Sequence, residues 1–198
     1  MKINPCVIGL GYVGLPLALE ISKKYKTIGF DINKKRIITL KKKIDFNNDL
    51  KKINFSRKKI FFTNRLNEIR NCNFYIISVP TPVYKNKTPN IKLLELSIRN
   101  LSKIIKKNDI IVIESTVYPG ATEKFARYIE NKTKLIENKD FFMGYSPERI
   151  NPGDKKNTLK NINKILALKT KNKEIKRKIS KVYNLVSEKL IHTSGIKE

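Results

Sequence analysis

The chain has 198 residues and a formal net charge of +26, and 40% of its residues are apolar. This length and composition suit one packed domain, and no apolar stretch approaches the ~18 residues that a membrane span needs. Composition therefore excludes a membrane-spanning protein, and because no signal-peptide pattern precedes the first apolar run, we expect a cytoplasmic one.

The N-terminal segment has the order of a dinucleotide-binding βαβ unit. An apolar run over residues 6–8 leads into Gly9-Leu10-Gly11-Tyr12-Val13-Gly14, a G-x-G-x-x-G turn. A helix is predicted over residues 15–24 and a second strand over residues 27–30. In such a unit the first glycine permits the tight turn, the second lets the backbone approach a pyrophosphate, and the third lets the helix pack on the strand. The complete pattern favours a nucleotide site over a tight βα connection without a ligand.

Asp31 ends the second predicted strand, 20 residues after Gly11. A carboxylate there can accept hydrogen bonds from the ribose diol of an adenosine, and it would repel a 2′-phosphate. NAD is therefore expected rather than NADP. Arg36 leaves three interpretations open: an ion pair with Asp31, stacking on adenine, or a solvated helix charge.

Strand and helix signals alternate through the rest of the chain. Strands are expected over residues 60–63, 74–79, 110–113, 141–145 and 164–168. Helices are expected over residues 34–43, 66–70, 91–106 and 174–187, with another ending near residue 130. Repeated βα units predict an α/β protein with a doubly wound, mostly parallel sheet.

Unusual residues gather where the predicted strands end. They are the glycine turn, Thr81, Thr116 and Glu148. In open α/β sheets, ligands bind outside the carboxyl ends of the strands. These residues are therefore expected to line one functional rim.

The remaining composition argues against other partners. Lysines occur in almost every loop and helix face rather than along one stripe, so we expect no specific nucleic-acid partner despite the charge. Cys6 and Cys72 lack the spacing of a metal site and are expected to be buried thiols without a disulfide or a metal. His192, the one histidine, is expected to be a frayed surface residue.

Three later segments resemble one family. They are Val79-Pro80-Thr81-Pro82, Glu114-Ser115-Thr116-Val117-Tyr118-Pro119-Gly120 and Tyr145-Ser146-Pro147-Glu148-Arg149-Ile150-Asn151-Pro152-Gly153-Asp154. They resemble the N-terminal domain of the UDP-glucose/GDP-mannose dehydrogenases. The last segment is closest to the branch that oxidises UDP-N-acetylhexosamines to uronic acids for surface polysaccharides.

The resemblance implies a Rossmann-type NAD-binding domain over residues 1–187. Residues 188–198 would then begin the connection to a central helix and a UDP-sugar-binding domain, which the 198 residues do not contain. The family homodimer would require that central helix. Two NAD molecules in succession would oxidise C6 of the sugar from alcohol to acid.

The resemblance also assigns roles to single residues. The implied cofactor contacts are Gly9, Gly11, Tyr12, Val13, Gly14, Asp31, Arg36, Pro80, Thr81, Thr116 and Glu148. Thr116 would also help order a catalytic water, and Glu148 would assist proton transfer or hydrolysis. Glu148, Arg149 and Ile150 would contact the substrate. Two structural alternatives stay open: Thr116 caps the turn before Pro119, and Glu148 only pairs with Arg149.

The family's nucleophilic Cys and catalytic Lys would lie further along the chain, and neither Cys6 nor Cys72 is placed to replace that Cys. We therefore expect this chain to bind NAD without completing the oxidation. Three alternatives remain: another Rossmann NAD-dependent dehydrogenase, which would lack the Ser-Pro-Glu-Arg segment; a non-catalytic basic nucleotide-binding module; and an inactive gene product.

Overall fold

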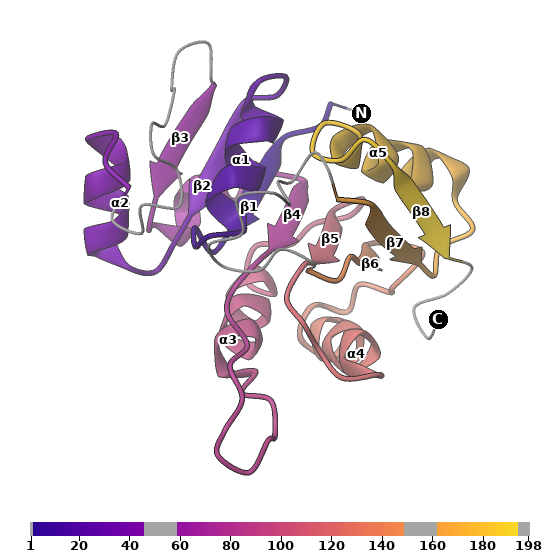
Figure 1. The fold of residues 1–198 in the computed structure, drawn as a ribbon. Helices are drawn as coiled ribbons and strands as arrows, with labels where there is room; N and C mark the ends of the chain where they lie inside the picture. The colour runs from indigo at the N-terminus through magenta and orange to yellow at the C-terminus, as the bar shows by residue number, and fades with distance from the viewer. Residues whose placement is uncertain (1, 46–58, 149–161, 194–198) are drawn as a thin grey trace.

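The computed structural model describes residues 2–45, 59–148 and 162–193, and they form one sheet with helices on both faces (Figure 1). The strands are β1 (Pro5–Ile8), β2 (Thr27–Phe30), β3 (Ile60–Thr63), β4 (Phe74–Ile77), β5 (Ile110–Ile113), β6 (Phe142–Tyr145), β7 (Lys164–Leu168) and β8 (Leu190–Thr193). The helices are α1 (Gly14–Ser22), α2 (Lys34–Lys41), the 3-10 helix η1 (Leu66–Ile69), α3 (Lys92–Leu101), α4 (Ala121–Thr133) and α5 (Lys173–Tyr183). Among the described residues the strand order is β3-β2-β1-β4-β5-β6-β7-β8.

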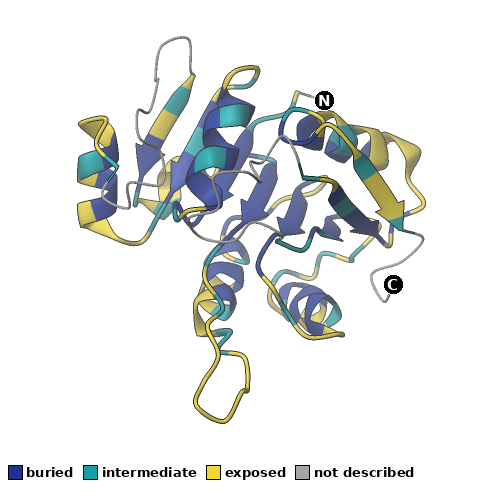
Figure 2. Cartoon of the chain, viewed as in Figure 1, coloured by how far each residue is buried: buried dark blue, intermediate teal, exposed yellow. Residues whose placement is uncertain are grey.

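Two apolar layers hold the helices to the sheet. Successive residues of a strand point to opposite faces, so Phe74 and Ile76 of β4 pack with α1, α2 and α5. Tyr75 and Ile77 of the same strand pack with η1, α3 and α4. Figure 2 shows the result: buried residues fill the central strands and the helix faces turned toward them, whereas the edge strand β8 is largely exposed. The predicted α/β fold with a doubly wound, mostly parallel sheet is confirmed.

Two features of the sheet differ from the sequence-based expectation. β7 runs antiparallel to β6, whereas the other neighbouring strands of the described sheet run parallel. The sheet also continues beyond residue 187: β8 pairs with β7 in the segment that we assigned to a connection. His192 accordingly lies in a strand, exposed, with its Nε2 atom 3.4 Å from the hydroxyl of Ser180. Residues 190–193 therefore extend the sheet.

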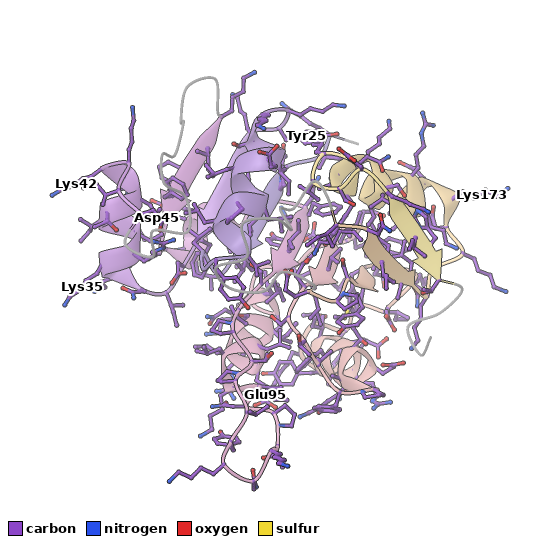
Figure 3. All side chains as sticks on the ribbon, viewed as in Figure 1. Tyr25, Lys35, Lys42, Asp45, Glu95 and Lys173 are labelled. Carbon is purple, nitrogen blue, oxygen red and sulfur yellow. The ribbon has the colours of Figure 1, made fainter. Side chains whose placement is uncertain are left out.

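The basic side chains are spread over the molecule. Figure 3 shows Lys35 and Lys42 projecting into solvent at one end of the sheet and Lys173 at the other. This scattered arrangement agrees with charge that serves as a solvated surface. No helix in the described part of the chain is both long enough and apolar enough to span a bilayer.

Candidate functional site

The glycine turn after β1 is fixed by contacts within the protein. Gly9 has a φ of +91°, and a Cβ added to it would lie 2.8 Å from the carbonyl oxygen of Ser78. A Cβ on Gly14 would lie 1.8 Å from the carbonyl oxygen of Gly9. The hydroxyl of Ser78, which follows β4, donates to that carbonyl at 2.9 Å. Packing between β1, α1 and the end of β4 therefore requires both glycines, whether or not a ligand binds.

Gly11 is different. A Cβ added to it would meet no atom within 4 Å, and its φ is not positive. The packing of the protein does not require a glycine here, whereas a pyrophosphate lying against the backbone would. The N-cap of α1, Val13, makes no side-chain capping bond, and the first turn of the helix carries no acidic residue. The open space and this helix N-terminus fit the phosphates of a dinucleotide.

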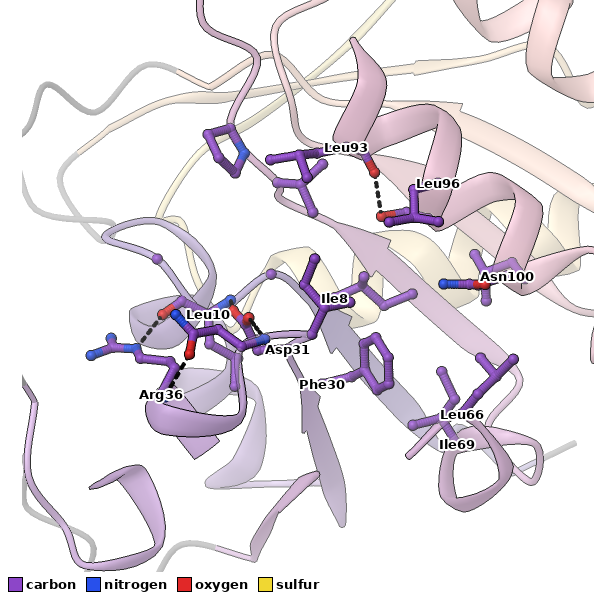
Figure 4. A pocket seen from close by; sticks show the side chains of 18 residues that line it. Ile8, Leu10, Phe30, Asp31, Arg36, Leu66, Ile69, Leu93, Leu96 and Asn100 are labelled. Carbon is purple, nitrogen blue, oxygen red and sulfur yellow. Dashed lines mark hydrogen bonds between the residues drawn. The ribbon is translucent and has the colours of Figure 1, made fainter. Parts of the chain in front are cut away.

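Asp31 lies directly after β2, beside the turn. One of its carboxylate oxygens accepts the backbone N–H of Leu10 at 2.8 Å, and the other accepts that of Asn33 at 2.8 Å (Figure 4). These bonds hold the carboxylate at the edge of a pocket, and each oxygen keeps a lone pair for a ribose hydroxyl. A 2′-phosphate would meet this negative charge, so the site fits NAD better than NADP.

Arg36 in α2 is buried rather than solvated. Its Nε donates to the carbonyl oxygen of Leu10 at 2.9 Å, and its Nη1 pairs with Asp45. In this structure Arg36 therefore braces the glycine turn, and its cation is balanced by Asp45 rather than by Asp31. The side chain still lines the pocket, so a contact with the adenosine end remains a prediction.

The pocket, about 340 Å³ in volume, lies between the glycine turn and α3. Its opposite wall comes from η1 and α3, which the sequence analysis did not assign to the site. The additional lining residues on that wall are Leu66, Ile69, Leu93, Leu96, Ser97, Asn100 and Leu101. The sequence does contain a hint of this wall: Leu93 and Leu96 are apolar but fall outside the apolar stripe of α3 that packs on the sheet. Apolar residues outside the core-facing stripe can indicate a second contact surface. Their mainly apolar surface suits the flat face of a nucleobase.

The ends of β4 and β5 are tied together beyond this pocket. The hydroxyl of Thr81 donates to the backbone carbonyl of Thr116 at 2.8 Å, and that of Ser115 donates to the carbonyl of Val79 at 2.6 Å. Pro80 lines the pocket, whereas Thr81 and Thr116 do not. Thr116 is exposed at the rim of the sheet. The pocket thus unites Gly9, Gly11, Asp31, Arg36 and Pro80, but its lining does not include Tyr12, Val13, Gly14, Thr81, Thr116 or Glu148.

Glu148 follows β6 and is largely buried, with 11% of its side chain exposed. One of its carboxylate oxygens lies 3.8 Å from the ammonium of Lys164. Lys164 also pairs with Glu114, the residue that directly follows β5. Sequence reasoning offered Arg149 as the partner of Glu148, but Arg149 and Ile150 lie outside the described residues. The sequence analysis did not identify Lys164 as a neighbour of the Glu148 carboxylate.

Both cysteines are buried and free. Cys6 lies in β1, and burial raises the pKa of its thiol well above the usual value. Cys72 precedes β4 and so lies at the edge opposite the carboxyl ends of the strands. A buried thiol with a raised pKa is a poor nucleophile at neutral pH, and neither cysteine lines the pocket.

Comparison with known proteins identifies relatives of nearly the whole chain. Residues 1–187 match the UDP-glucose/GDP-mannose dehydrogenase family, NAD binding domain. The chain is 42% identical over 187 residues to the UDP-N-acetyl-D-glucosamine 6-dehydrogenase of Salmonella typhi. The alignment covers 93% of this chain and 44% of that protein. It is 41% identical to protein CapL of Staphylococcus aureus, over 98% of this chain and 46% of that protein. The chain thus spans less than half the length of these relatives.

Solved structures with the same fold include dehydrogenases. The UDP-D-ManNAc dehydrogenase from Pyrococcus horikoshii superimposes with a TM-score of 0.85 at 29% identity, over 98% of this chain and 47% of that one. The GDP-mannose dehydrogenase from Pseudomonas aeruginosa has a TM-score of 0.80 at 20% identity, which supports the fold alone.

Proposed function

The chain belongs to the UDP-glucose/GDP-mannose dehydrogenase family as its NAD-binding domain, and from this premise we propose that it supplies the NAD site of a UDP-N-acetylhexosamine 6-dehydrogenase. The family resemblance drawn from the sequence is confirmed. The overall reaction would oxidise the C6 alcohol of the sugar to a carboxylate, with two hydrides passing to two NAD molecules in turn. The substrate class is inferred from the relatives' names, UDP-N-acetyl-D-glucosamine and UDP-N-acetyl-D-mannosamine dehydrogenases.

The open space at Gly11 is the observation that carries the proposal. Gly11 lies in the chain between Gly9 and Gly14, both packed tightly against protein atoms, and shortly before α1, whose N-cap makes no side-chain hydrogen bond. We infer that the pyrophosphate lies against Gly11, with the adenosine in the pocket between Asp31 and α3. Thr81 and Thr116 would then border the nicotinamide at the ends of β4 and β5, and Glu148 would meet the sugar from the end of β6.

Calorimetric titration of the 198-residue chain with NAD and with NADP tests this site. We expect NAD to bind with a dissociation constant of roughly micromolar order and NADP at least about tenfold more weakly, which corresponds to about 1.4 kcal/mol. Asp31→Asn keeps the size of the side chain and removes its charge, so it should weaken NAD and reduce the preference over NADP. Equal binding of both cofactors by the parent chain would contradict the assignment of Asp31.

The chemical half of the proposal needs a separate measurement. A nucleophile must reach the sugar aldehyde, and both cysteines of this chain are buried away from the pocket. We therefore expect the purified 198-residue chain to bind NAD but not to oxidise UDP-N-acetylglucosamine or UDP-N-acetylmannosamine through to the acid, so that no steady-state turnover is seen. Steady-state NADH formation, followed at 340 nm, would contradict this. UDP-glucose serves as the comparison sugar.

A further inference from the structure

Lys164 is a charged residue in the interior of the protein. Its side chain is 1% exposed, and it begins β7 with no access to solvent. Lysine is almost never fully buried unless it is paired, because removing an ammonium from water is costly. Apolar residues of similar volume at such positions are often neutral or stabilising. The lysine therefore calls for a reason beyond packing.

The antiparallel direction of β7 explains how Lys164 reaches the functional rim. Gly144 pairs with Leu168 and Tyr145 with Ala167. Continuing this register brings the start of β7 opposite the residues that follow β6. A parallel strand would have brought its start to the other edge of the sheet. The reversal of β7 thus carries an ammonium to the edge where β5 and β6 are followed by Glu114 and Glu148.

Two carboxylates lie close to the ammonium of Lys164. The ammonium donates a hydrogen bond to Glu114, whose side chain is fully buried, and lies 3.8 Å from Glu148. Burial first, and then Glu114 and Glu148, raise the pKa of the Tyr183 phenol in α5. Burial, and to a smaller extent Glu114, also raise the pKa of Tyr145 in β6. Lys164 thus joins the carboxylates that follow β5 and β6.

We propose that Lys164 is a positioning residue for Glu148, bridging it to Glu114 and holding its carboxylate charged and oriented at the end of β6. Glu114 anchors the ammonium by a direct hydrogen bond. Glu148 lies 3.8 Å from the same ammonium, at the distance of an ion pair. The role of this carboxylate toward the sugar rests on the proposed function, but its coupling to Lys164 is a property of the chain alone.

The proposal is tested by titrating the Glu148 carboxyl with ¹³C NMR in the chain without cofactor, the resonance being assigned through Glu148→Gln. Lys164→Met should raise the pKa of Glu148 by at least about one unit, a tenfold gain in proton affinity, because burial remains while the neighbouring cation is lost. Lys164→Arg should restore the titration of the parent chain. Lys169→Met is the matched control: it removes the same charge just after the other end of β7, where Lys169 pairs with Glu123.

Lys164→Met leaves Glu114 charged and buried, so the protein can fail to fold. The double variant Glu114→Gln/Lys164→Met removes the pair together and leaves no uncompensated partner. Its Glu148 should titrate higher than in Glu114→Gln alone, because that comparison removes only the cation. An equal Glu148 titration in these two folded variants would overturn the proposal and make the pair purely structural. Failure of NAD binding would instead overturn the proposed function, because this titration needs no cofactor.

Discussion

At the scale of single residues, the three glycines of the turn have different physical tasks. The spacing of Gly9, Gly11 and Gly14 was sufficient to predict a turn, a close approach and a helix contact. The structure adds which of them the fold itself requires. Gly9 and Gly14 contact protein backbone, whereas Gly11 borders open space. The partner of the turn, Ser78, was not predictable, because its contact spans 69 residues of chain.

Alanine variants of Gly11 and Gly14 should separate binding from stability. Gly14→Ala would force a Cβ to within 1.8 Å of a carbonyl oxygen, and overpacking of this kind costs about 3 kcal/mol or more. Gly11→Ala should change the free energy of unfolding by less than about 0.5 kcal/mol and weaken NAD at least about tenfold. Urea denaturation and calorimetry measure the two quantities. Equal NAD affinity in Gly11→Ala would contradict a pyrophosphate at this position.

Asp109, just before β5, gives a pH prediction. It is 1% exposed and accepts the backbone N–H of Lys106 at 2.8 Å, and burial raises its pKa from 3.8 to about 6. Because the folded state holds this proton more tightly than the unfolded state, the contribution of Asp109 to stability is present below pH ~4 and falls as the pH rises to ~6.

The contribution of Asp109 is isolated by comparison with Asp109→Asn, which keeps an acceptor oxygen and does not titrate. The free energy of unfolding of the parent chain, minus that of the variant, should fall by up to about 3 kcal/mol between pH 4 and pH 6. Denaturant melts across this range measure the difference. A difference that stays constant with pH would show that Asp109 keeps an ordinary pKa in the folded protein.

At the scale of elements, α3 has two apolar faces with separate purposes. Leu94, Ile98 and Leu101 face the sheet, in the stripe that the sequence predicted at steps of three and four. Leu93 and Leu96 lie on the adjoining face and line the pocket. The periodicity was sufficient to place the first face. It could not place the second, because that face is defined by the distant glycine turn.

Two leucines of α3 therefore form a matched pair of variants. Leu94→Ala should destabilise the protein by about 2–5 kcal/mol, since it leaves a cavity in the core. Leu96→Ala removes a side chain that is already 38% exposed, so the free energy of unfolding should change by less than about 1 kcal/mol while NAD affinity falls. The two measurements are urea denaturation and NAD titration. Unchanged NAD affinity in Leu96→Ala would remove α3 from the site.

Most strands and their parallel pairing were predictable, but the reversal at β7 was not. Strands over residues 27–30, 60–63, 110–113 and 164–168 were predicted with the observed bounds, because short apolar runs between polar segments define them locally. The direction of β7 depends on how it pairs with β6, and no local sequence pattern determines that pairing. β8 was missed because its residues are exposed or half-buried, without the apolar run of a central strand. The Lys164 network follows from that same reversal.

At the scale of the whole molecule, the net charge of +26 predicts weak, non-specific attraction to polyanions. Lysines spread over all sides cannot follow a groove of DNA, but they release counterions wherever they meet phosphates. Fluorescence anisotropy should show duplex DNA binding that falls by about 10³-fold or more between 50 and 200 mM salt, whereas NAD affinity should change little. Binding to one DNA sequence that persists at the higher salt concentration would instead favour the basic binding module.

The contact of Ser78 with the glycine turn also determines when the nucleotide pocket can form while the chain is being synthesised. Gly9 and Gly14 leave the ribosome well before Ser78, which belongs to their close packing, and before Asn100 and Leu101, which line the opposite wall of the pocket. A nascent chain therefore contains the whole glycine turn long before the nucleotide pocket has formed. Cofactor capture becomes a late event, available only after about half of these residues have been translated and β4 has joined β1.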